Sequence, residues 1–421
     1  IAISAPCNKK SALVNGLFYD NLSPTRNTSG ILCGFTTTGA TGNLTDADTT
    51  NFAGFTITGL DCALEYSVKD LDIPDTYPAG YFAGFKVSSL NLVSGSIDSK
   101  VRIETYNDGS FVEGRDVVTS LLGIEASLID GAGNATLGFV TTGAFDEIRI
   151  KYTTLVGVLF SGQVYHAVIE KFCPGPALNC NIQKQLNNDQ FPTIIELART
   201  GISGAVCIGC SINNSENVIS MSTSDSATIT LTAALGTIAS ISVKDVLRNY
   251  PAGTFAGFNI RNLKLVGLDV LSGITISTYK DSVFQENSTV GGTLLSLNSS
   301  LLNGTGEQLV GFVTTMSFDE IKFEITNLLG VANVTQVFSA VVDSFCVGPV
   351  LPCNEPVALT VPEYPVYVNG AQTGIYGGVC VGCSINNTNN LLDSDTSNYA
   401  SIVLLLNSGI SGSISVKDAL T

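Results

Sequence analysis

The chain has 421 residues, of which 44% are apolar and 13% charged, and its formal net charge is −16 at pH 7. This length allows two or three domains that each bury a core, and the apolar fraction excludes a disordered acidic tail. The acidic excess repels phosphate, which argues against nucleic-acid binding, and no apolar stretch is long enough for a membrane-spanning helix. A single histidine, His166, excludes multi-histidine metal sites.

An internal repeat organises the chain. Residues 77–85 (YPAGYFAGF) recur as residues 250–258 (YPAGTFAGF), 173 positions later. The tetrapeptide Phe-Asp-Glu-Ile recurs at the same offset, and Ser-Val-Lys-Asp occurs three times, beginning at Ser67, Ser242 and Ser415. The chain therefore contains tandem copies of one module.

These matches predict two full repeats, over residues 1–176 and 177–349, and the start of a third over residues 350–421. The third copy stops well before the point at which the second copy ends, and a domain cut there would lose most of its strands. We therefore expect the chain to be part of a longer protein. The linkers that begin at Cys173 and Cys346 contain Gly and Pro and are predicted to be too short and stiff for free domain motion.

Short strands are predicted throughout each repeat. Pro-Ala-Gly at 78–80 and 251–253 predicts a turn before a strand, because proline fixes φ and glycine permits a positive φ. Apolar and polar residues alternate over 239–244 and 321–325, as in strands with one buried face. We predict an all-β fold of tandem jelly-roll-like β-sandwich repeats of about 173 residues, with a short helix near residues 294–302.

The cysteines follow the repeat. Four per full repeat predict two disulfides per domain and an oxidising, extracytoplasmic location. Four cysteines allow three pairings, and we expect the first to pair with the second and the third with the last, as in Cys180–Cys207 and Cys210–Cys346. The cysteines expected to form disulfides are Cys7, Cys33, Cys62, Cys173, Cys180, Cys207, Cys210, Cys346, Cys353, Cys380 and Cys383.

Two Cys-x-x-Cys segments, 207–210 and 380–383, also match a thiol redox motif and zinc ligands. The redox motif requires a helix after the first cysteine, whereas Ser-Ile-Asn-Asn follows here, which is typical of a strand and a turn. The two pairs also lie in different repeats, which argues against one zinc ion held by both. Structural disulfides are therefore the favoured interpretation.

Asp-rich loops at matching positions of the first and third repeats predict a cation site. Clustered oxygen ligands on a loop suit calcium. The alternative is an Asx-rich turn, in which the side chains accept hydrogen bonds from local backbone amides. The second repeat has Ser220-Met221-Ser222 at this position and lacks the acids, which favours the turn. The predicted calcium ligands are Asp46, Asp48, Asn51, Asp393, Asp395 and Asn398.

Other recurring charges do not predict catalysis. The acid pairs at 146–147 and 319–320 consist of strand neighbours, whose side chains point to opposite faces and cannot converge on a glycosidic bond. Lys69, Lys244 and Lys417 recur before an aspartate and indicate a solvated strand face, with an intramolecular Lys–carboxyl crosslink as the alternative. No catalytic constellation recurs, so we do not expect an enzyme.

Residues 390–400 (NLLDSDTSNYA) resemble the opening of discoidin-like, galactose-binding-like jelly-roll domains. The Tyr-Pro-Ala-Gly-x-Phe-Ala-Gly-Phe and Phe-Asp-Glu-Ile blocks resemble long repetitive surface proteins of Bacteroidota, a group that includes gliding-motility adhesins exported by the type IX secretion system. The resemblance implies a secreted array on the cell surface that serves adhesion or gliding motility, with calcium in the Asp-rich loop.

We therefore expect an extracellular, non-enzymatic repeat protein of the cell surface that forms an extended stalk or filament. Its expected partners are surface glycans, a substratum or like chains. The alternative is an array of carbohydrate-binding modules, which would need platforms of Tyr and Phe because the chain has no Trp. A hydrolase is a third hypothesis, and it lacks a recurring catalytic constellation.

Overall fold

The fold is all-β, as predicted, and it divides into two compact units, Ile1–Cys173 and Pro174–Thr421. The part of the chain that the structure describes contains strands and short 3-10 helices but no α-helix, and none of its helices is long and apolar enough to cross a bilayer. This computed structural model describes residues 6–16, 19, 21–71, 76–93, 100–118, 134–154, 159–204, 207–208, 210–231, 233–234, 236–262, 273–289, 295–296, 307–327, 333–369, 372–377, 382–404 and 409–420.

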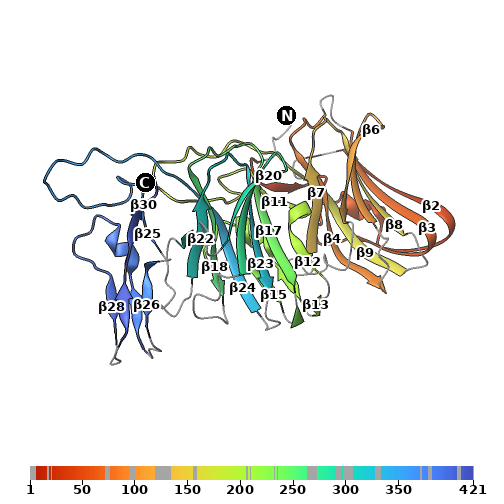
Figure 1. Ribbon diagram of the computed structural model, residues 1–421. Helices are drawn as coiled ribbons and strands as arrows, with labels where there is room; N and C mark the ends of the chain where they lie inside the picture. The colour runs from red at the N-terminus through yellow and green to blue at the C-terminus, as the bar shows by residue number, and fades with distance from the viewer. Residues whose placement is uncertain are drawn as a thin grey trace. The chain divides into compact units, whose positions relative to one another are not determined.

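The first unit is an antiparallel β-sandwich built around one long strand, β3. Residues 53–57 of β3 pair with β9, and residues 62–69 pair with β8, so this strand belongs to both layers. The strand order is β6-β5-β8-β3-β9-β4-β7, with β1 added to β9 and β2 to β3. The elements are β1 (Lys10–Ala12), β2 (Leu22–Thr38), η1 (Thr41–Leu44), β3 (Ala53–Asp70), β4 (Phe82–Val93), β5 (Lys100–Asn107), β6 (Ser110–Val118), β7 (Asn134–Val140), β8 (Glu147–Thr154) and β9 (Leu159–Glu170) (Figure 1).

The second unit begins with a sandwich of the same strand order. Its two layers are separate sheets, β14-β15-β24-β18-β22-β21 and β11-β17-β23-β19-β20, because the counterpart of β3 is split into β15 and β17. Two short strands complete them, since β10 pairs with β24 and β12 with β17. The elements are β10 (Lys184–Gln185), β11 (Thr193–Ile195), η2 (Leu197–Arg199), β12 (Gly201–Ser203), β13 (Cys207–Ile208), β14 (Ser211–Asn213), η3 (Ser215–Ile219), β15 (Ala227–Leu231), β16 (Ala233–Ala234), β17 (Thr237–Asp245), β18 (Thr254–Asn262), β19 (Ile274–Lys280), β20 (Val283–Thr289), β21 (Leu295–Ser296), β22 (Glu307–Val313), β23 (Glu320–Asn327) and β24 (Asn333–Ser344).

The same unit continues into residues 350–421, which we call the third segment. Its strands form three two-stranded ladders, β25 with β30, β26 with β29, and β27 with β28. The short helix expected near residues 294–302 falls on β21, which is a strand, and on residues outside the described ranges. The elements of the third segment are β25 (Val366–Val368), β26 (Gly374–Tyr376), β27 (Ser384–Asn386), η6 (Thr388–Leu391), β28 (Ser401–Val403), β29 (Ser411–Ser413) and β30 (Val416–Asp418).

The recurring sequence blocks meet at one corner of each sandwich. In the first unit, the Tyr77 hydroxyl donates to Asp70 Oδ2 over 2.7 Å, and the Tyr77 ring lies 5.2 Å from the ring of Phe145. Asp146 accepts from the backbone N–H of Asp108 and faces Lys69 Nζ at 3.1 Å. The Ser-Val-Lys-Asp, Tyr-Pro-Ala-Gly and Phe-Asp-Glu-Ile blocks thus meet through five side chains, which we call the corner cluster: Lys69, Asp70, Tyr77, Phe145 and Asp146.

The corner cluster is rebuilt in the second unit with the same geometry. Tyr250 donates to Asp245 Oδ2 over 2.8 Å and lies 5.2 Å from the Phe318 ring, and Lys244 Nζ faces Asp319 Oδ2 at 3.5 Å. A buried tyrosine hydroxyl needs a partner, and the aspartate supplies it in both copies. The recurrence of these blocks is therefore explained by folding.

The disulfides pair differently from the expected scheme. The first cysteine pairs with the last, as Cys7–Cys173 and Cys180–Cys346, and the two inner cysteines of the first unit pair as Cys33–Cys62. The first pairing follows from the topology, because β1 lies antiparallel to β9 and so brings the two ends of the repeat together. The second joins neighbouring strands of the β2–β3 hairpin.

The remaining cysteines complete this framework in part. Cys210 and Cys383 are disulfide-bonded, whereas the side chain of Cys207 and all of Cys380 lie outside the described residues. Cys353 is exposed and has no disulfide within the described chain, so the prediction that it is paired is not met here. The expected pairing of Cys180 with Cys207, and of Cys210 with Cys346, is wrong.

The disulfide framework predicts a graded loss of stability. Cys7–Cys173 closes a sequence separation of 166 and Cys33–Cys62 one of 29. On the chain-entropy model, the longer loop stabilises the first unit by about 1.5 kcal/mol more than the shorter one. Urea unfolding of the Cys7→Ala/Cys173→Ala and Cys33→Ala/Cys62→Ala variants checks this order. An equal loss in both, or non-reducing peptide maps that link Cys7 to Cys33, would contradict it.

Candidate functional site

The linker between the two units is anchored at both ends. Cys173 belongs to the disulfide of the first unit. Two residues later, Gly175 packs against Phe191, where an added Cβ would lie 2.5 Å from the ring. Arg248 donates to the carbonyl oxygens of Gly175 over 3.0 Å and Pro176 over 2.8 Å. Gly175 and Pro176 are therefore held within the second unit, directly after the last residue of the first.

The outer face of one sheet of the second unit is apolar where it meets the third segment. Phe255 on β18, Leu309 on β22 and Val341 on β24 form one buried cluster with Tyr367 on β25, and Phe345 packs against it. Full burial of a side chain of this size contributes about 2 kcal/mol. This contact, which we call the junction, holds the third segment on the sandwich.

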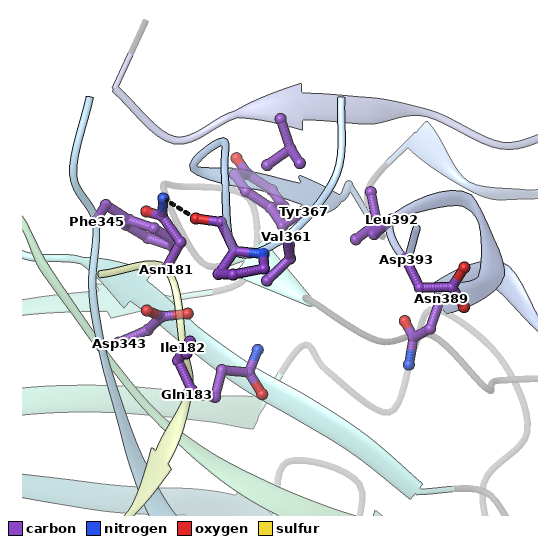
Figure 2. Close-up of a pocket in the computed structure, with 12 residues that line it drawn as sticks. Asn181, Ile182, Gln183, Asp343, Phe345, Val361, Tyr367, Asn389, Leu392 and Asp393 are labelled. Atoms are coloured by element: carbon purple, nitrogen blue, oxygen red, sulfur yellow. Dashed lines mark hydrogen bonds between the residues drawn. The ribbon is translucent and has the colours of Figure 1, made fainter. Parts of the chain in front are cut away.

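Asn181 links the sandwich to the third segment through hydrogen bonds of its side chain. It is buried, has a positive φ of 56° and accepts a hydrogen bond from the Cys346 backbone N–H at Oδ1 over 2.9 Å. Its Nδ2 donates to the carbonyl oxygen of Pro362 in the third segment over 2.8 Å, as the dashed line in Figure 2 shows. Asn8 follows Cys7 in the same conformation, and its Oδ1 accepts from the Cys173 N–H.

The Cys-Asn pair was not singled out from the sequence. It occurs three times, at Cys7, Cys180 and Cys353, each time followed by an asparagine with a positive φ. A residue that tolerates the left-handed region and also accepts a hydrogen bond suits this position, and asparagine does both. The repetition of this dipeptide in the sequence could have indicated the structural role of the asparagine.

A pocket of about 370 Å³ opens at the junction. This volume lies within the range of small-molecule sites. Figure 2 shows the Asp343 carboxylate on the side of the sandwich, and Val361, Tyr367 and Leu392 on the side of the third segment. The polar side chains that line the pocket are Asn181, Gln183, Asn389, Asp343 and Asp393.

Asp343 is the unusual member of this pocket. Its residue is 4% exposed, and its Oδ1 is buried without a hydrogen-bond partner in the described structure. It shares the outer sheet face with Val341 and stands opposite Phe255 in the ladder, so its surroundings are apolar. Burial raises the pKa of the Asp343 carboxyl to about 7. A buried, unsatisfied carboxylate of this kind is a functional-site candidate.

The predicted calcium residues form hydrogen-bonded turns. In the first repeat, Asp46 accepts from the Asp48 N–H over 3.0 Å and from Asn51 Nδ2 over 2.9 Å, and Asp48 accepts from the Thr50 N–H over 3.0 Å. These bonds recur in the third segment. Its corresponding residues are Asp393, Asp395, Ser397 and Asn398.

The second repeat builds a similar turn without acids. Ser222 Oγ accepts from the backbone N–H groups of Ser224 and Asp225, each over 3.3 Å. The described residues hold no group of three or more His, Cys, Asp or Glu side chains arranged for a metal ion. The carboxylates of both loops thus accept hydrogen bonds from nearby amides, as Asp46, Asp48, Asp393 and Asp395 show. Calcium binding at these residues stays a prediction.

The acid pairs do not converge. Asp146 lies in the corner cluster, whereas Glu147 pairs with Arg149 over 2.8 Å. In the second unit, Asp319 faces Lys244, and Glu320 accepts from Arg199 and Ser242. Lys69 and Lys244 are therefore ion-paired residues.

His166 has no counterpart in the second repeat and lies buried on β9. Burial and the nearby charge of Lys86 lower its pKa to about 4, so the imidazole is neutral at physiological pH. Its Nδ1 has no hydrogen-bond partner in the part of the chain that is described.

Comparison with known proteins yields no family. No family model matches the chain, and no curated protein sequence matches it significantly. Among solved structures, an allantoicase matches at 10% identity and a TM-score of 0.27, covering 74% of this chain and 90% of the other. The tandem CBM22 domains of Xyn10C from Paenibacillus barcinonensis match at 10% identity and a TM-score of 0.22, with 82% and 100% covered.

A further match is truncated AlyQ with its CBM32 and alginate lyase domains, at 11% identity and a TM-score of 0.17, covering 77% of this chain and 100% of the other. At these scores, the likenesses support no argument about activity. The β-sandwich architecture rests on the strand pairing itself.

The buried carboxyl of Asp343 predicts a pH-dependent stability. An unfolded aspartate ionises near its ordinary pKa of 3.8, whereas folded Asp343 holds its proton up to about pH 7. The free energy of unfolding therefore falls as pH rises from about 4 to about 7, because the unfolded state releases this proton more readily than the folded state. We expect Asp343→Asn to raise the melting temperature at pH 8 and to have little effect near pH 4, as measured by calorimetry.

The matched control is Glu170→Gln at the equivalent position of the first repeat, which faces Lys10 across the ladder and should show no gain at pH 8. Asp393 is the other carboxylate in the pocket, and its oxygens accept bonds within its own loop. An Asp343→Asn effect that is the same at both pH values would contradict the prediction.

Proposed function

We propose that this chain is an extracellular, non-catalytic repeat protein of the cell surface, whose β-sandwiches form an extended and stiff stalk. The observation that supports this most strongly is the junction, where an apolar sheet face of one repeat is covered by the next segment. Such a stalk would act in adhesion or gliding motility, with surface glycans, a substratum or like chains as partners. Disulfides of this kind fit a secreted protein.

The anchored linker supports the proposal independently. A flexible tether gives its domains independent motion, and its reach grows with its length. Here the chain passes from the disulfide at Cys173 to the clamp at Gly175 without an intervening free stretch. The second linker repeats the arrangement, since Gly348 packs against Tyr364 as Gly175 packs against Phe191. Stiffness would thus be a property of every linker in the array.

Electron microscopy of the full chain tests the stalk. We expect elongated particles with a narrow spread of angles between repeats. A flexible Gly-Ser segment inserted between Cys173 and Pro174 should broaden that spread, because it separates the two anchors. The same insertion in the β5–β6 turn, between Asp108 and Gly109, is the control and should leave the angles unchanged. Compact globules from the unaltered chain would refute the proposal.

An array of carbohydrate-binding modules is the second candidate. Each sandwich carries a half-exposed phenylalanine at one turn, Phe111 or Phe284, packed edge-on against a tyrosine, Tyr106 or Tyr279. An arginine stacks on that tyrosine in both copies, from β8 in the first unit and from η2 in the second. An exposed aromatic ring can pack on the apolar face of a sugar, and the arginine beside it can hydrogen-bond to the sugar hydroxyls.

Glycan-array binding by the full chain tests this second candidate. If sugars stack on these rings, Phe111→Ala together with Phe284→Ala should weaken binding by about tenfold, because each lost ring removes a buried contact. Leu247→Ala, at another exposed apolar position, is the control and should change nothing. Absence of glycan binding by the unaltered chain, or full binding by the double variant, would exclude a role for these rings.

A further inference from the structure

The first repeat shows how an acid at the end of the last strand can be accommodated. Glu170 on β9 is buried and stands directly opposite Lys10 on β1. The Lys10 Nζ lies 5.7 Å from the centroid of the Phe82 ring, where its charge interacts with the face of the aromatic. A lysine ammonium, an acid and a phenylalanine therefore share this edge of the first sandwich.

The second repeat keeps the acid and the phenylalanine but not the lysine. Asp343 and Phe255 occupy the positions of Glu170 and Phe82, 173 residues later. Gln183 occupies the position of Lys10 and lines the pocket, so the side chain opposite Asp343 carries no charge. Asp343 Oδ1 has no partner in the described structure, and the pocket lies beside it.

The lining of the pocket selects the kind of cation. Neither lysine, arginine nor histidine is among the lining residues that are described, whereas two aspartates are. Calcium takes six to eight oxygen ligands, whereas both oxygens of Asp393 already accept bonds within its own loop, and Phe345, Val361 and Leu392 present apolar side chains to the pocket. An alkylammonium suits such a site, because its hydrocarbon chain packs on apolar walls while its N–H groups reach a carboxylate.

We propose that the junction pocket binds a primary alkylammonium group, such as a lysine side chain carries, with Asp343 as its counter-ion. The amides of Asn389 and Gln183 offer oxygens for the remaining N–H groups. The ligand would restore the charge that Lys10 provides in the first repeat. This site lies within the second unit and does not depend on the stalk proposed above.

Titration of the full chain with n-butylammonium chloride tests the site by calorimetry and by carboxyl-carbon NMR. We expect saturable binding, with a shifted Asp343 resonance. Asp343→Asn should weaken binding by about tenfold or more, because a charge-assisted hydrogen bond is lost. Glu170→Gln, the matched change in the first repeat, should leave it intact. A peptide with a single internal lysine distinguishes the source, since its binding would show that a protein side chain can enter.

Gln183→Lys provides a second, gain-of-function test. It places in the second repeat the lysine that the first repeat has, so it should raise the melting temperature at pH 8 and block n-butylammonium binding. n-Butanol, which has the same chain without the charge, should not bind. Binding of n-butylammonium that persists in both Asp343→Asn and Gln183→Lys would overturn the proposal. So would displacement of Asp343-dependent signals by calcium chloride alone, with no response to the amine.

Discussion

The structure depends on the pairing of the first strand of each repeat with its last. β1 lies against β9 in the first unit and β10 against β24 in the second, and a disulfide joins the cysteines beyond each pair. A repeat that is closed in this way begins and ends at the same edge. Gly175, two residues after Cys173, already packs against Phe191 within the second unit.

The same closure places chemistry at the junction. The strand pair that ends at Cys346 carries Asp343 and Val341 on its outer face, and the asparagine after Cys180 extends across it to Pro362. The outer face of an antiparallel sheet is commonly solvated, but here it is apolar and the third segment covers it. One acidic residue lies within that apolar surface, and its isolation makes the pocket a candidate site.

The recurring motifs and the candidate site have different physical origins. Three motifs recur because their side chains meet in the corner cluster: Tyr-Pro-Ala-Gly, Phe-Asp-Glu-Ile and Ser-Val-Lys-Asp. There a tyrosine hydroxyl donates to an aspartate, and the tyrosine ring packs on a phenylalanine ring. The proposed ammonium site is argued instead from a difference between copies, the replacement of Lys10 by Gln183. The motifs that recur are therefore those that the fold needs, whereas the proposed site lies where the second repeat differs from the first.

The sequence by itself determined the period of 173 residues, the all-β class and the presence of a disulfide framework, because alternation and self-similarity are local properties of the chain. It did not determine the pairing of the cysteines, since that depends on which strand ends meet across a separation of 166. Nor did it single out Asp343, an ordinary acid in a strand, which is buried in a pocket that Tyr367 of β25 also lines and whose Oδ1 has no partner in the described structure. Both were decided by the tertiary structure, because contacts between residues far apart in the chain set them.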